Sequence, residues 1–326
     1  MYEISVVIPV RDEEKNVCEL ASRIITTLER IHKTYEIVFV TDINRDNTVD
    51  VLEALYKENP NIKTIKLTNG FGHHVAVMAG LDYCSGEYIV VMDGDLQDLP
   101  EDIPLLYNKI IEGYDVVYTV KEKKNTGYIR NLYSKLFNSI MGMLSDVKFD
   151  SNSSMFRIIS RKALEEIVKF REQGLSITYM FSFINLPTTY ITVRSGVRLY
   201  GETKYSFFRL LNFAITSLIS FSVKPLRMIS NFGLLVSAIS FLYLIVILLQ
   251  KLFFGIPVLG WTTIISLIML FSGIQLLSLG IIGEYIGKIY IQTKDRPLYI
   301  IEKKIGHFQG DEMPRECHTI IHQFHS

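Results

Sequence analysis

Two long uncharged stretches near the C-terminal end constrain this 326-residue chain more than any other feature. Residues 229–249 and 258–283 contain no charged side chain, and Lys251 is the only charge between them. About 20 consecutive apolar residues are enough to cross a bilayer as a helix. We therefore expect a two-helix transmembrane hairpin over residues 228–287, rather than a pair of buried helices in a soluble protein. The connecting sequence contains Gly, Pro and Trp261, which is typical of a short turn at the far membrane surface.

Basic side chains are concentrated on the two outer flanks of this hairpin. Arg209, Lys224 and Arg227 precede it. The basic residues that follow it are Lys288, Lys294, Arg296, Lys303 and Lys304. The positive-inside rule then predicts that both ends of the hairpin, and both chain termini, lie in the cytoplasm. We expect residues 204–227, which mix aromatic and basic side chains, to form amphipathic helices in the membrane interface, and residues 288–326 to form a cytosolic C-terminal tail.

In the N-terminal part of the chain, short β-branched runs alternate with stretches whose apolar residues have helical spacing. We expect strands at residues 4–10, 36–40, 62–67 and 88–92, and helices at residues 16–30, 48–57 and 74–84. This alternation predicts right-handed βαβ units and a doubly wound, Rossmann-like α/β sheet. Ligands of such sheets bind beyond the carboxyl ends of the strands. We assign residues 1–203 to this one domain.

The composition excludes several other classes of protein. The 34 basic and 34 acidic side chains balance, so no overall field favours binding to nucleic acid. Cys18, Cys84 and Cys317 lie far apart without CxxC spacing, so we expect neither a disulfide framework nor a zinc site. The N-terminus begins directly with a strand-like run and has no cleavable signal, so we expect the α/β domain to be cytosolic.

Polar residues occur at the points where the predicted strands end. Arg11, Asp42 and Asp93 occupy such positions, so the sequence predicts that they converge on one crevice. Asp93 opens an Asp-Gly-Asp sequence that ends at Asp95 and is followed by Gln97. Two carboxylates separated by one residue can reach one hard cation, and Mg²⁺ or Mn²⁺ fills its other positions with phosphate oxygens and water. The alternative is a charged turn that caps the next helix, but the position at a strand end favours a metal ion.

An ordered series of motifs covers nearly the whole chain. It begins with SVVIPVRDEE and continues with FGHHVAVMAGLDYCSGEYIVVMDGDLQDLPEDIP, GYDVVYTVKEKK and FRIISRKAL. It ends with RLYGETKYSFFRLL, FSVKPLRM and LGIIGEYIGKIY. In these motifs the chain resembles the family 2 glycosyltransferases with a GT-A fold, and more closely the polyprenyl-phosphate glycosyltransferases, which include dolichol-phosphate mannose synthase. The resemblance implies a nucleotide-sugar donor and a polyprenyl phosphate acceptor at the cytoplasmic face of a lipid bilayer.

On the donor side, the resemblance assigns roles to residues at the strand ends. Pro9, Arg11 and Glu13 match positions that hold the nucleotide base and ribose, and Asp42 matches the acid after the second strand. The residues that match the metal and diphosphate ligands are Asp93, Asp95 and Gln97. A Mg²⁺ or Mn²⁺ ion held there would stabilise the nucleotide diphosphate as a leaving group.

Four residues further along the chain match phosphate-binding positions of the family. Arg130 and Ser134 match groups that receive the acceptor phosphate, and Arg198 and Lys204 match basic residues that close over the donor phosphates. A guanidinium group suits such sites because its paired donors fit phosphate oxygens. Taken alone, Arg130 would be interpreted as a solvated helix residue. Contact with lipid headgroups is an equal alternative for Arg198 and Lys204.

Three positions depart from the pattern of the family. Relatives usually have Asp-Asp-Gly-Ser where residues 41–44 read Thr-Asp-Ile-Asn, and a Tyr where this chain has Arg11. Relatives also often carry an acid, proposed as a base, where this chain has Met155. A phosphate nucleophile with a second pKa of about 6 is largely dianionic near neutral pH, so it needs little help from a base. Asp150 is a candidate to replace the missing carboxylate in part.

The sequence therefore predicts an inverting, metal-dependent transfer of a sugar from a nucleotide-sugar to undecaprenyl or dolichyl phosphate. One alternative is a transferase that extends a lipid-linked glycan or a polysaccharide, although processive synthases generally carry a further acceptor motif and more spans. A second alternative is a non-catalytic, nucleotide-sugar-binding scaffold in the membrane, which the departures at residues 41–44 and Met155 suggest. A homo-oligomer would be compatible with close helix packing at Gly233, Gly273, Gly280, Gly283 and Gly287.

Overall fold

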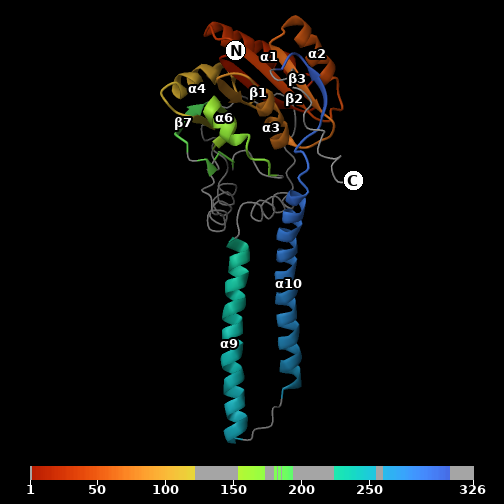
Figure 1. The fold of residues 1–326 in the computed structure, drawn as a ribbon, viewed down its shortest axis with the longest axis vertical. Coiled ribbons are helices and arrows are strands. Elements are labelled where there is room, and N and C mark those ends of the chain that lie inside the picture. Colours follow the sequence, from red (N-terminus) through yellow and green to blue (C-terminus); the bar gives the residue numbers. More distant parts are fainter. Residues whose placement is uncertain are drawn as a thin grey trace, which may run out of the picture.

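The computed structural model describes residues 2–121, 153–172, 180–193 apart from 182 and 185, 224–254 and 260–308. These residues form an α/β domain on one eight-stranded sheet, and a long helical hairpin that extends from one end of this domain (Figure 1). Some predicted site residues lie outside the described residues, namely Arg130, Ser134, Asp150, Arg198 and Lys204. Most of the segment expected to lie in the membrane interface, residues 204–223, is also outside them.

The N-terminal elements agree with those predicted from periodicity to within one residue at each end. They are β1 (Ile4–Val10), α1 (Val17–Arg30), β2 (Tyr35–Thr41), α2 (Thr48–Glu58), β3 (Ile62–Leu67), α3 (His73–Tyr83) and β4 (Tyr88–Val91). The later elements are a 3₁₀ turn (Pro100–Asp102), α4 (Ile103–Ile110), β5 (Val116–Lys121), β6 (Ser153–Ser160), α6 (Arg161–Ile167), β7 (Thr188–Val193), α9 (Lys224–Phe254), α10 (Trp261–Thr293) and β8 (Ile301–Ile305).

The sheet has the strand order β7-β5-β6-β4-β1-β2-β3-β8. The four central strands, β4, β1, β2 and β3, are parallel, as the βαβ alternation predicts. β6 runs antiparallel to both β4 and β5, and β8 runs antiparallel to β3. The sheet is therefore mixed rather than wholly parallel, because the strands after β4 do not all continue the βαβ pattern.

Helices cover both faces of the sheet, and alternate strand residues point to each. In β1, Val6 and Ile8 pack with the buried faces of α1 and α4, whereas Val7 packs with α3 and α6. All seven residues of β1 are buried, which explains its continuous apolar sequence. This two-layered burial makes the central strands a rigid base for the loops at their ends.

β8 was not predicted from the sequence. We expected residues 288–326 to form a tail, but Ile301–Ile305 is an edge strand whose Thr64–Ile305 and Lys66–Lys303 pairs join it to β3. α10 also continues to Thr293, beyond the boundary at residue 287 that we expected. The sequence IEKKI has too few apolar residues to indicate a strand, and its pairing depends on a partner more than 230 residues earlier in the chain.

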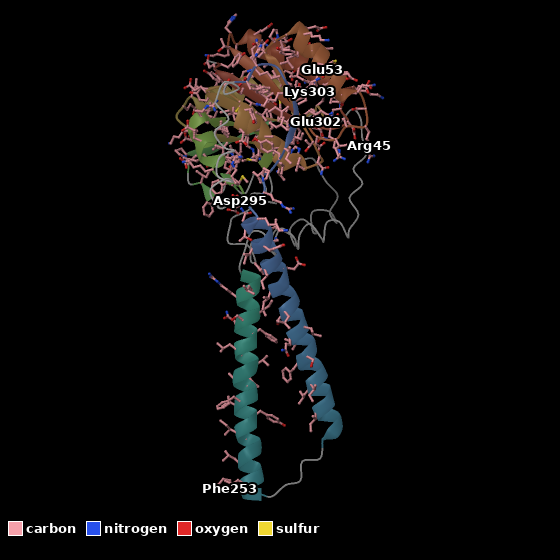
Figure 2. The ribbon with its side chains drawn as sticks, turned by 45° about the vertical axis from the view of Figure 1, so that its right-hand side comes forward. Arg45, Glu53, Phe253, Asp295, Glu302 and Lys303 are labelled. Atoms are coloured by element: carbon pink, nitrogen blue, oxygen red, sulfur yellow. The ribbon has the colours of Figure 1, made fainter. Side chains whose placement is uncertain are left out.

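The hairpin has the opposite distribution of apolar side chains to the domain. Large apolar residues along α9 and α10 are exposed, including Leu234 (74%), Leu252 (78%) and Leu276 (69%). Figure 2 shows Phe253 at the end of α9 furthest from the domain and Asp295 where α10 meets it. Among the residues that the structure describes, one helical stretch, Phe271–Thr293, has the length and apolar character needed to cross a bilayer. The apolar stretch in α9, Ile229–Tyr243, is shorter than this.

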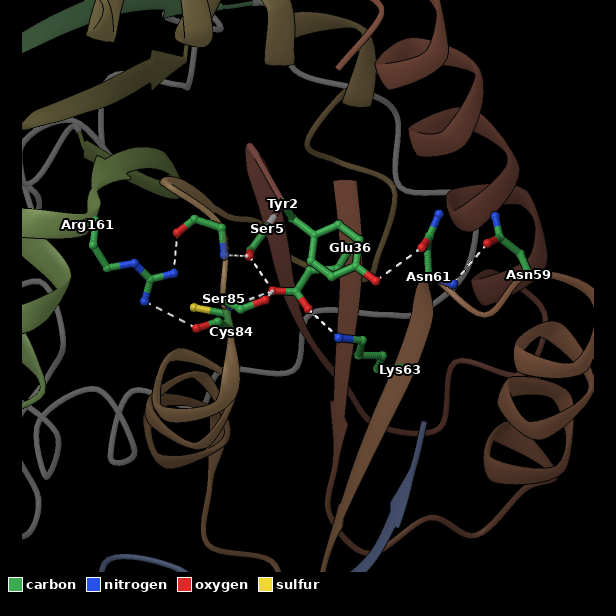
Figure 3. Close-up of polar contacts among 10 residues, drawn as sticks. Tyr2, Ser5, Glu36, Asn59, Asn61, Lys63, Cys84, Ser85 and Arg161 are labelled. Carbon is green, nitrogen blue, oxygen red and sulfur yellow. Dashed lines mark hydrogen bonds and ion pairs between the residues drawn. The ribbon is translucent and has the colours of Figure 1, made fainter. Parts of the chain in front are cut away.

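The amino ends of the central strands contain a buried polar network (Figure 3). Glu36 of β2 is fully buried and lies 2.7 Å from Lys63 Nζ of β3. Ser5 Oγ and Ser85 Oγ donate to the other carboxylate oxygen at 2.6 Å and 2.9 Å. Burial raises the pKa of Glu36, but the hydrogen bonds from Lys63, Ser5 and Ser85 outweigh it and hold the pKa below its ordinary value. This carboxylate is charged, and both of its oxygens accept hydrogen bonds within the fold.

Candidate active site

The carboxyl ends of the central strands, opposite to the Glu36 network, bring three of the predicted site residues together. We call this side of the sheet the carboxyl edge, and the side with Glu36 the amino edge. Arg11 and Asp42 directly follow the neighbouring strands β1 and β2, and Asp93 follows β4 on the other side of β1. Arg11 Nε lies 3.9 Å from Asp42 Oδ1. Gly94 packs directly on the end of β1, because a Cβ atom there would lie 2.7 Å from Val10 Cγ1. The acidic motif and the nucleotide-binding candidates therefore share one edge.

The turn that contains Asp93, Asp95 and Gln97, here called the acidic turn, is stabilised by the buried Asp98, which was not among the predicted site residues. The backbone N–H of Asp93 donates to Asp98 Oδ2 at 3.2 Å, and Lys121 Nζ lies 3.0 Å from Asp98 Oδ1. Asp98 is only 2% exposed, so both contacts act in a medium of low dielectric constant. Within the turn, the backbone N–H of Gln97 donates to Asp95 Oδ1 at 3.1 Å. These bonds fix the backbone from which Asp93 and Asp95 project.

On balance, the surroundings of Asp93 disfavour its negative charge. Its side chain is 37% exposed, but its Oδ1 is buried and accepts no hydrogen bond from any residue that the structure describes. Burial raises the pKa of Asp93 to about 6, with Asp98 and Asp95 adding to the shift and His73 opposing it. His73 Nε2, in the first turn of α3, lies 3.3 Å from Oδ1. A cation bound to this carboxylate would relieve both the burial cost and the repulsion between the acids.

The two histidines at the start of α3 differ in their surroundings. His73 is 42% exposed at its side chain and faces Asp93. Burial, with smaller effects from His73 and Arg157, lowers the pKa of His74 to about 4, so His74 is neutral at physiological pH. Both histidines line a cavity of about 140 Å³, which Met180 and Leu298 also line. They lie within the FGHH sequence of the second motif. They were not predicted as site residues, because they begin a helix and do not directly follow a strand.

Arg157 of β6 is fully buried and interacts electrostatically with Asp93 and Asp98 of the acidic turn. Its guanidinium carbon is 5.1 Å from the ring centre of Tyr118 and 4.9 Å from that of Phe181. Burial lowers the pKa of Arg157 to about 10, so it remains charged and favours the negative charges of Asp93 and Asp98. Sequence reasoning missed this residue because a single arginine inside a strand gives no sign of which acids it faces.

Met155, at the position where relatives often carry an acid, serves Arg157 instead. Its backbone carbonyl accepts a hydrogen bond from Arg157 Nε at 3.1 Å, and its Sδ lies 3.6 Å from Arg157 Nη2. Ser154 also accepts from Arg157 Nη2 through its carbonyl, at 2.9 Å. The residue that replaces the acid of the relatives thus contacts the buried Arg157 guanidinium.

The departures at residues 41–44 also interact with one another. The side-chain amide of Asn44 donates to Thr41 Oγ1 and to the carbonyl of Asp42. Asn44 Oδ1 accepts from the backbone N–H of Asp12 at 3.0 Å, and Asp12 Oδ1 accepts from the N–H of Arg45 at 2.6 Å. These bonds join the loop after β1 to the loop after β2 and hold Asp42 between them.

The remaining predicted donor-side residues are placed by the backbone around them. Pro9 is buried within β1, and its carbonyl oxygen faces Gly94. Glu13 lies in the loop after β1, where its backbone N–H donates to Thr48 Oγ1 at 3.0 Å and its side chain accepts from Asn16. Glu13 therefore lies in a loop at the carboxyl edge. Pro9 borders the site with its backbone carbonyl.

The donor chemistry of the acidic turn fits a Mg²⁺ or Mn²⁺ ion. Such ions prefer carboxylate oxygens, bind few protein ligands and retain positions for phosphate oxygens and water. Asp93 has a buried oxygen that accepts no hydrogen bond from the described part of the chain, and Asp95 supplies a second carboxylate from the same turn. Within the described part of the chain, no group of three or more His, Cys, Asp or Glu side chains is gathered for a metal.

The acidic edge of the sheet faces the hairpin. α10 ends at Thr293, and the N–H of Thr68, at the carboxyl end of β3, donates to the carbonyl of Ile300 at 2.9 Å. β8 then runs away from the hairpin, antiparallel to β3. The parallel strands β1 to β4 therefore run toward the hairpin, and the N-terminus lies at the far end of the domain (Figure 1).

Comparisons with known proteins agree with this division of the chain. The model of the family described as glycosyl transferase family 2 matches residues 5–168. The model described as the GtrB C-terminal hairpin matches residues 224–289. The first match contains every described residue of the candidate site before β7, and the second contains α9 and most of α10.

Curated relatives match this chain over almost its whole length. An uncharacterized glycosyltransferase of Bacillus subtilis, YkcC, is 36% identical over 97% of this chain and 98% of its own. The bactoprenol glucosyl transferase of Shigella phage SfII is 34% identical over 92% and 98%. The undecaprenyl-phosphate 4-deoxy-4-formamido-L-arabinose transferase of Proteus mirabilis is 32% identical over 93% and 94%.

Among solved structures, glucosyl-3-phosphoglycerate synthase from Mycobacterium tuberculosis, in complex with Mn²⁺, UDP-glucose and phosphoglyceric acid, matches with a TM-score of 0.48 and 19% identity. That match covers 67% of this chain and 79% of the other. The family model that spans half of the chain, and the long relatives above, establish the assignment. The chain belongs to glycosyltransferase family 2, with an α/β GT-A domain built on a mixed sheet.

Proposed function

We propose that this enzyme transfers a sugar from a nucleotide-sugar to the phosphate of a polyprenyl phosphate at the cytoplasmic face of a membrane. The observation that carries the proposal is the placement of Arg11, Asp42 and Asp93 on the edge of the sheet from which the apolar hairpin extends. Such an arrangement brings a water-soluble donor next to a lipid-borne acceptor. The relatives named for bactoprenol and undecaprenyl phosphate support the same class of acceptor.

In this proposal α9 and α10 both cross the bilayer. Exposed residues such as Leu234 and Leu252 would cost about 25 cal/mol per Å² of apolar surface left in water, and this cost disappears in lipid. The basic flanks orient the hairpin with the catalytic domain and both termini in the cytoplasm. Residues 204–227 would then lie in the interface between the domain and the headgroups.

The donor would lie along the acidic edge. Asp42 and Arg11 would hold its nucleoside end, with Pro9 and Glu13 beside them, and the acidic turn would hold its diphosphate. A Mg²⁺ or Mn²⁺ ion bound by Asp93, Asp95 and Gln97 would supply charge neutralisation that makes the diphosphate a better leaving group. The protein's own contribution is to hold these carboxylates in place before the donor arrives, through Asp98, Lys121 and Arg157.

The acceptor phosphate would be its own nucleophile. Its oxygen would attack the anomeric carbon from the face opposite the departing diphosphate, which inverts the configuration. Because a phosphate monoester is largely dianionic near pH 7, the enzyme's task is alignment rather than proton removal, and an acid at Met155 is not needed. Arg130 and Ser134 are proposed to receive the acceptor phosphate, and Arg198 and Lys204 to close over the donor phosphates.

The acceptor can be tested with purified protein in liposomes of defined composition. Undecaprenyl phosphate, a lipid-linked sugar, or neither would be supplied with a panel of radiolabelled UDP-, GDP- and dTDP-sugars, and the lipid would be extracted and counted. The proposal predicts that label enters the lipid only with undecaprenyl phosphate and one or a few donors. Transfer only to the lipid-linked sugar would replace this function with chain extension, and donor binding without transfer to either would indicate a scaffold.

A further inference from the structure

The segment that follows α10 is fastened to α3 by a cluster of three side chains. Tyr299 Oη donates to Asp82 Oδ2 at 2.6 Å, and Arg171 donates to both carboxylate oxygens of Asp82 at 2.7 Å and 2.9 Å. Asp82 lies in the last turn of α3, Arg171 follows α6, and Tyr299 lies between α10 and β8. We call Asp82, Arg171 and Tyr299 the clasp. It joins three parts of the chain that are distant in sequence.

The clasp is partly buried and well matched in charge. Asp82 is 13% exposed at its side chain, and its bidentate pair with Arg171 has the geometry of the stronger carboxylate–guanidinium contacts. Burial, and then the hydrogen bond to Asp82, raise the pKa of Tyr299, so its hydroxyl remains a donor at any physiological pH. Gln292, near the end of α10, donates to the carbonyl of Arg171 at 3.5 Å. These four residues line a cavity of about 370 Å³ at the junction of hairpin and domain.

The rest of the segment after α10 is built into the domain. Seven residues, Lys294–Ile300, separate the last residue of α10 from the first of β8. Beyond them, Lys303 Nζ lies 2.5 Å from Glu53 Oε1, on the face where Figure 2 labels both residues. Phe308 packs edge-on against Tyr83, the last residue of α3, with ring centres 5.7 Å apart. α10 therefore meets the domain through a short, anchored connection.

The other end of α3 lies at the acidic turn. His73, the first residue of α3, has its Nε2 3.3 Å from Asp93 Oδ1. Leu298, the neighbour of Tyr299, lines the cavity that contains His73 and His74. An 11-residue helix is about 16 Å long, so α3 connects the clasp at its last turn to the carboxylate at its first.

We propose that Asp82, Arg171 and Tyr299 are positioning residues, which hold the acidic turn at a fixed height and angle relative to the membrane hairpin. The inference rests on the proposed function, because it concerns an acceptor whose phosphate is confined to the membrane surface. A tilt of the domain that moves the donor by about 1 Å relative to that surface takes its anomeric carbon out of line with the acceptor phosphate. A misplacement of this size can reduce a rate by about 100-fold. An acceptor that is free in water can follow the site and is insensitive to the tilt.

The variants that test this are Tyr299→Phe and Asp82→Asn, with Glu53→Gln as the matched control. Tyr299→Phe removes one hydroxyl, and Glu53→Gln breaks an ion pair to the same C-terminal segment without touching the clasp. Each protein would be assayed in liposomes with undecaprenyl phosphate and, separately, with a short-chain, water-soluble prenyl phosphate. The clasp predicts about a tenfold or greater loss with the membrane acceptor for Asp82→Asn, a smaller loss for Tyr299→Phe, and less than a twofold change with the soluble one.

Equal losses with both acceptors would show that the clasp only stabilises the fold, and no loss with either would also overturn the proposal. A second measurement does not depend on turnover. Spin labels at Glu58→Cys and Leu276→Cys, in a Cys18→Ser and Cys317→Ser background that keeps the buried Cys84, would report the distance between the domain and α10 in lipid. The distance distribution should be narrow with the clasp intact and broader with Asp82→Asn, and an unchanged width would refute the positioning role. Wild-type protein that transfers to neither acceptor would reject the proposed function while leaving this second test valid.

Discussion

Carboxylates at the amino ends and at the carboxyl ends of the central strands lie in opposite electrostatic surroundings. At the amino edge, the carboxylate of Glu36 is surrounded by Lys63, Ser5 and Ser85, and its pKa lies below the ordinary value. At the carboxyl edge, Asp93 has a buried oxygen without a hydrogen-bond donor among the described residues, and its pKa is raised to about 6. The same strands thus carry one acid whose charge is stabilised by the fold and one whose charge is not.

This difference separates a structural role from a functional one. The fold gains stability from the charge on Glu36 above the ordinary pKa of a glutamate and loses it as the pH falls. The raised pKa of Asp93 has the opposite effect, because the folded protein disfavours the charged form. The cost in stability grows as the pH rises from the ordinary pKa of an aspartate to about 6, and is complete above that. A cost of this kind is expected where a group must remain available for a ligand.

The largest expected effect comes from removing charge at the carboxyl edge. Asp95→Asn and Asp93→Asn should each reduce turnover by at least ~10³-fold, because the diphosphate loses its anchor. Asp93→Asn should leave the melting temperature at pH 7.5 unchanged or raise it slightly, since it removes a half-buried charge that its surroundings disfavour on balance. Steady-state kinetics and thermal unfolding of the same preparations would check this. A large fall in melting temperature for Asp93→Asn would erase the contrast between the two edges.

The converse change at the amino edge should affect stability instead. Glu36→Gln leaves the Lys63 ammonium buried without its counter-charge, which should cost about 3–5 kcal/mol of unfolding free energy. Turnover per folded molecule should change little, because Glu36 lies at the opposite end of the strands from the site. Denaturant unfolding in detergent would measure the loss. Glu112→Gln, which breaks an exposed pair with Lys109, is the control and should cost no more than about 1 kcal/mol.

A smaller effect is expected at His73. His73→Ala removes the side chain that lies 3.3 Å from Asp93 Oδ1, and should reduce kcat/KM by about tenfold through loss of alignment. His73→Gln keeps a hydrogen-bond donor and should recover part of this loss. His32→Ala, at a site outside the crevice, is the control. If His73→Ala retained full activity at limiting donor and metal concentrations, the contact with Asp93 would have no functional part.

The smallest effect is a shift in pH dependence. A cation binds the charged form of Asp93, so protons and metal compete for the carboxylate, and metal binding at low ion concentration should fall as the pH drops through about 6. Free ion at ten times its dissociation constant should move the acid midpoint down by about one pH unit. Mn²⁺ binding without acceptor, measured from pH 5 to pH 8 at two ion concentrations, would show it, because the acceptor phosphate itself titrates near pH 6 and would affect initial rates. A midpoint that does not respond to metal would remove Asp93 from the metal site.

The central strands, their helices and the collection of Arg11, Asp42 and Asp93 at one edge could be predicted from the sequence. Buried parallel strands have a continuous apolar signature, and their topology dictates which ends meet. β8 could not be predicted, because a short, charged strand at a sheet edge is specified by its distant partner. His73, Asp98 and Arg157 were missed for a related reason. His73 of α3 and Arg157 of β6 act on Asp93 from distant parts of the chain, and Asp98 bonds to the Asp93 backbone within one turn, so none of the three gives a periodic signal in the sequence.

The account depends most on a charged turn that acts on a donor at the membrane surface. The most direct test is the transfer of radiolabelled sugar from its nucleotide into undecaprenyl phosphate in liposomes, with wild-type protein and Asp95→Asn compared with and without Mg²⁺ or Mn²⁺. The account predicts label in the lipid for the wild type with divalent ion, and background counts when either the ion or the Asp95 carboxylate is removed. Equal labelling by Asp95→Asn, or labelling that persists after chelation, would contradict it.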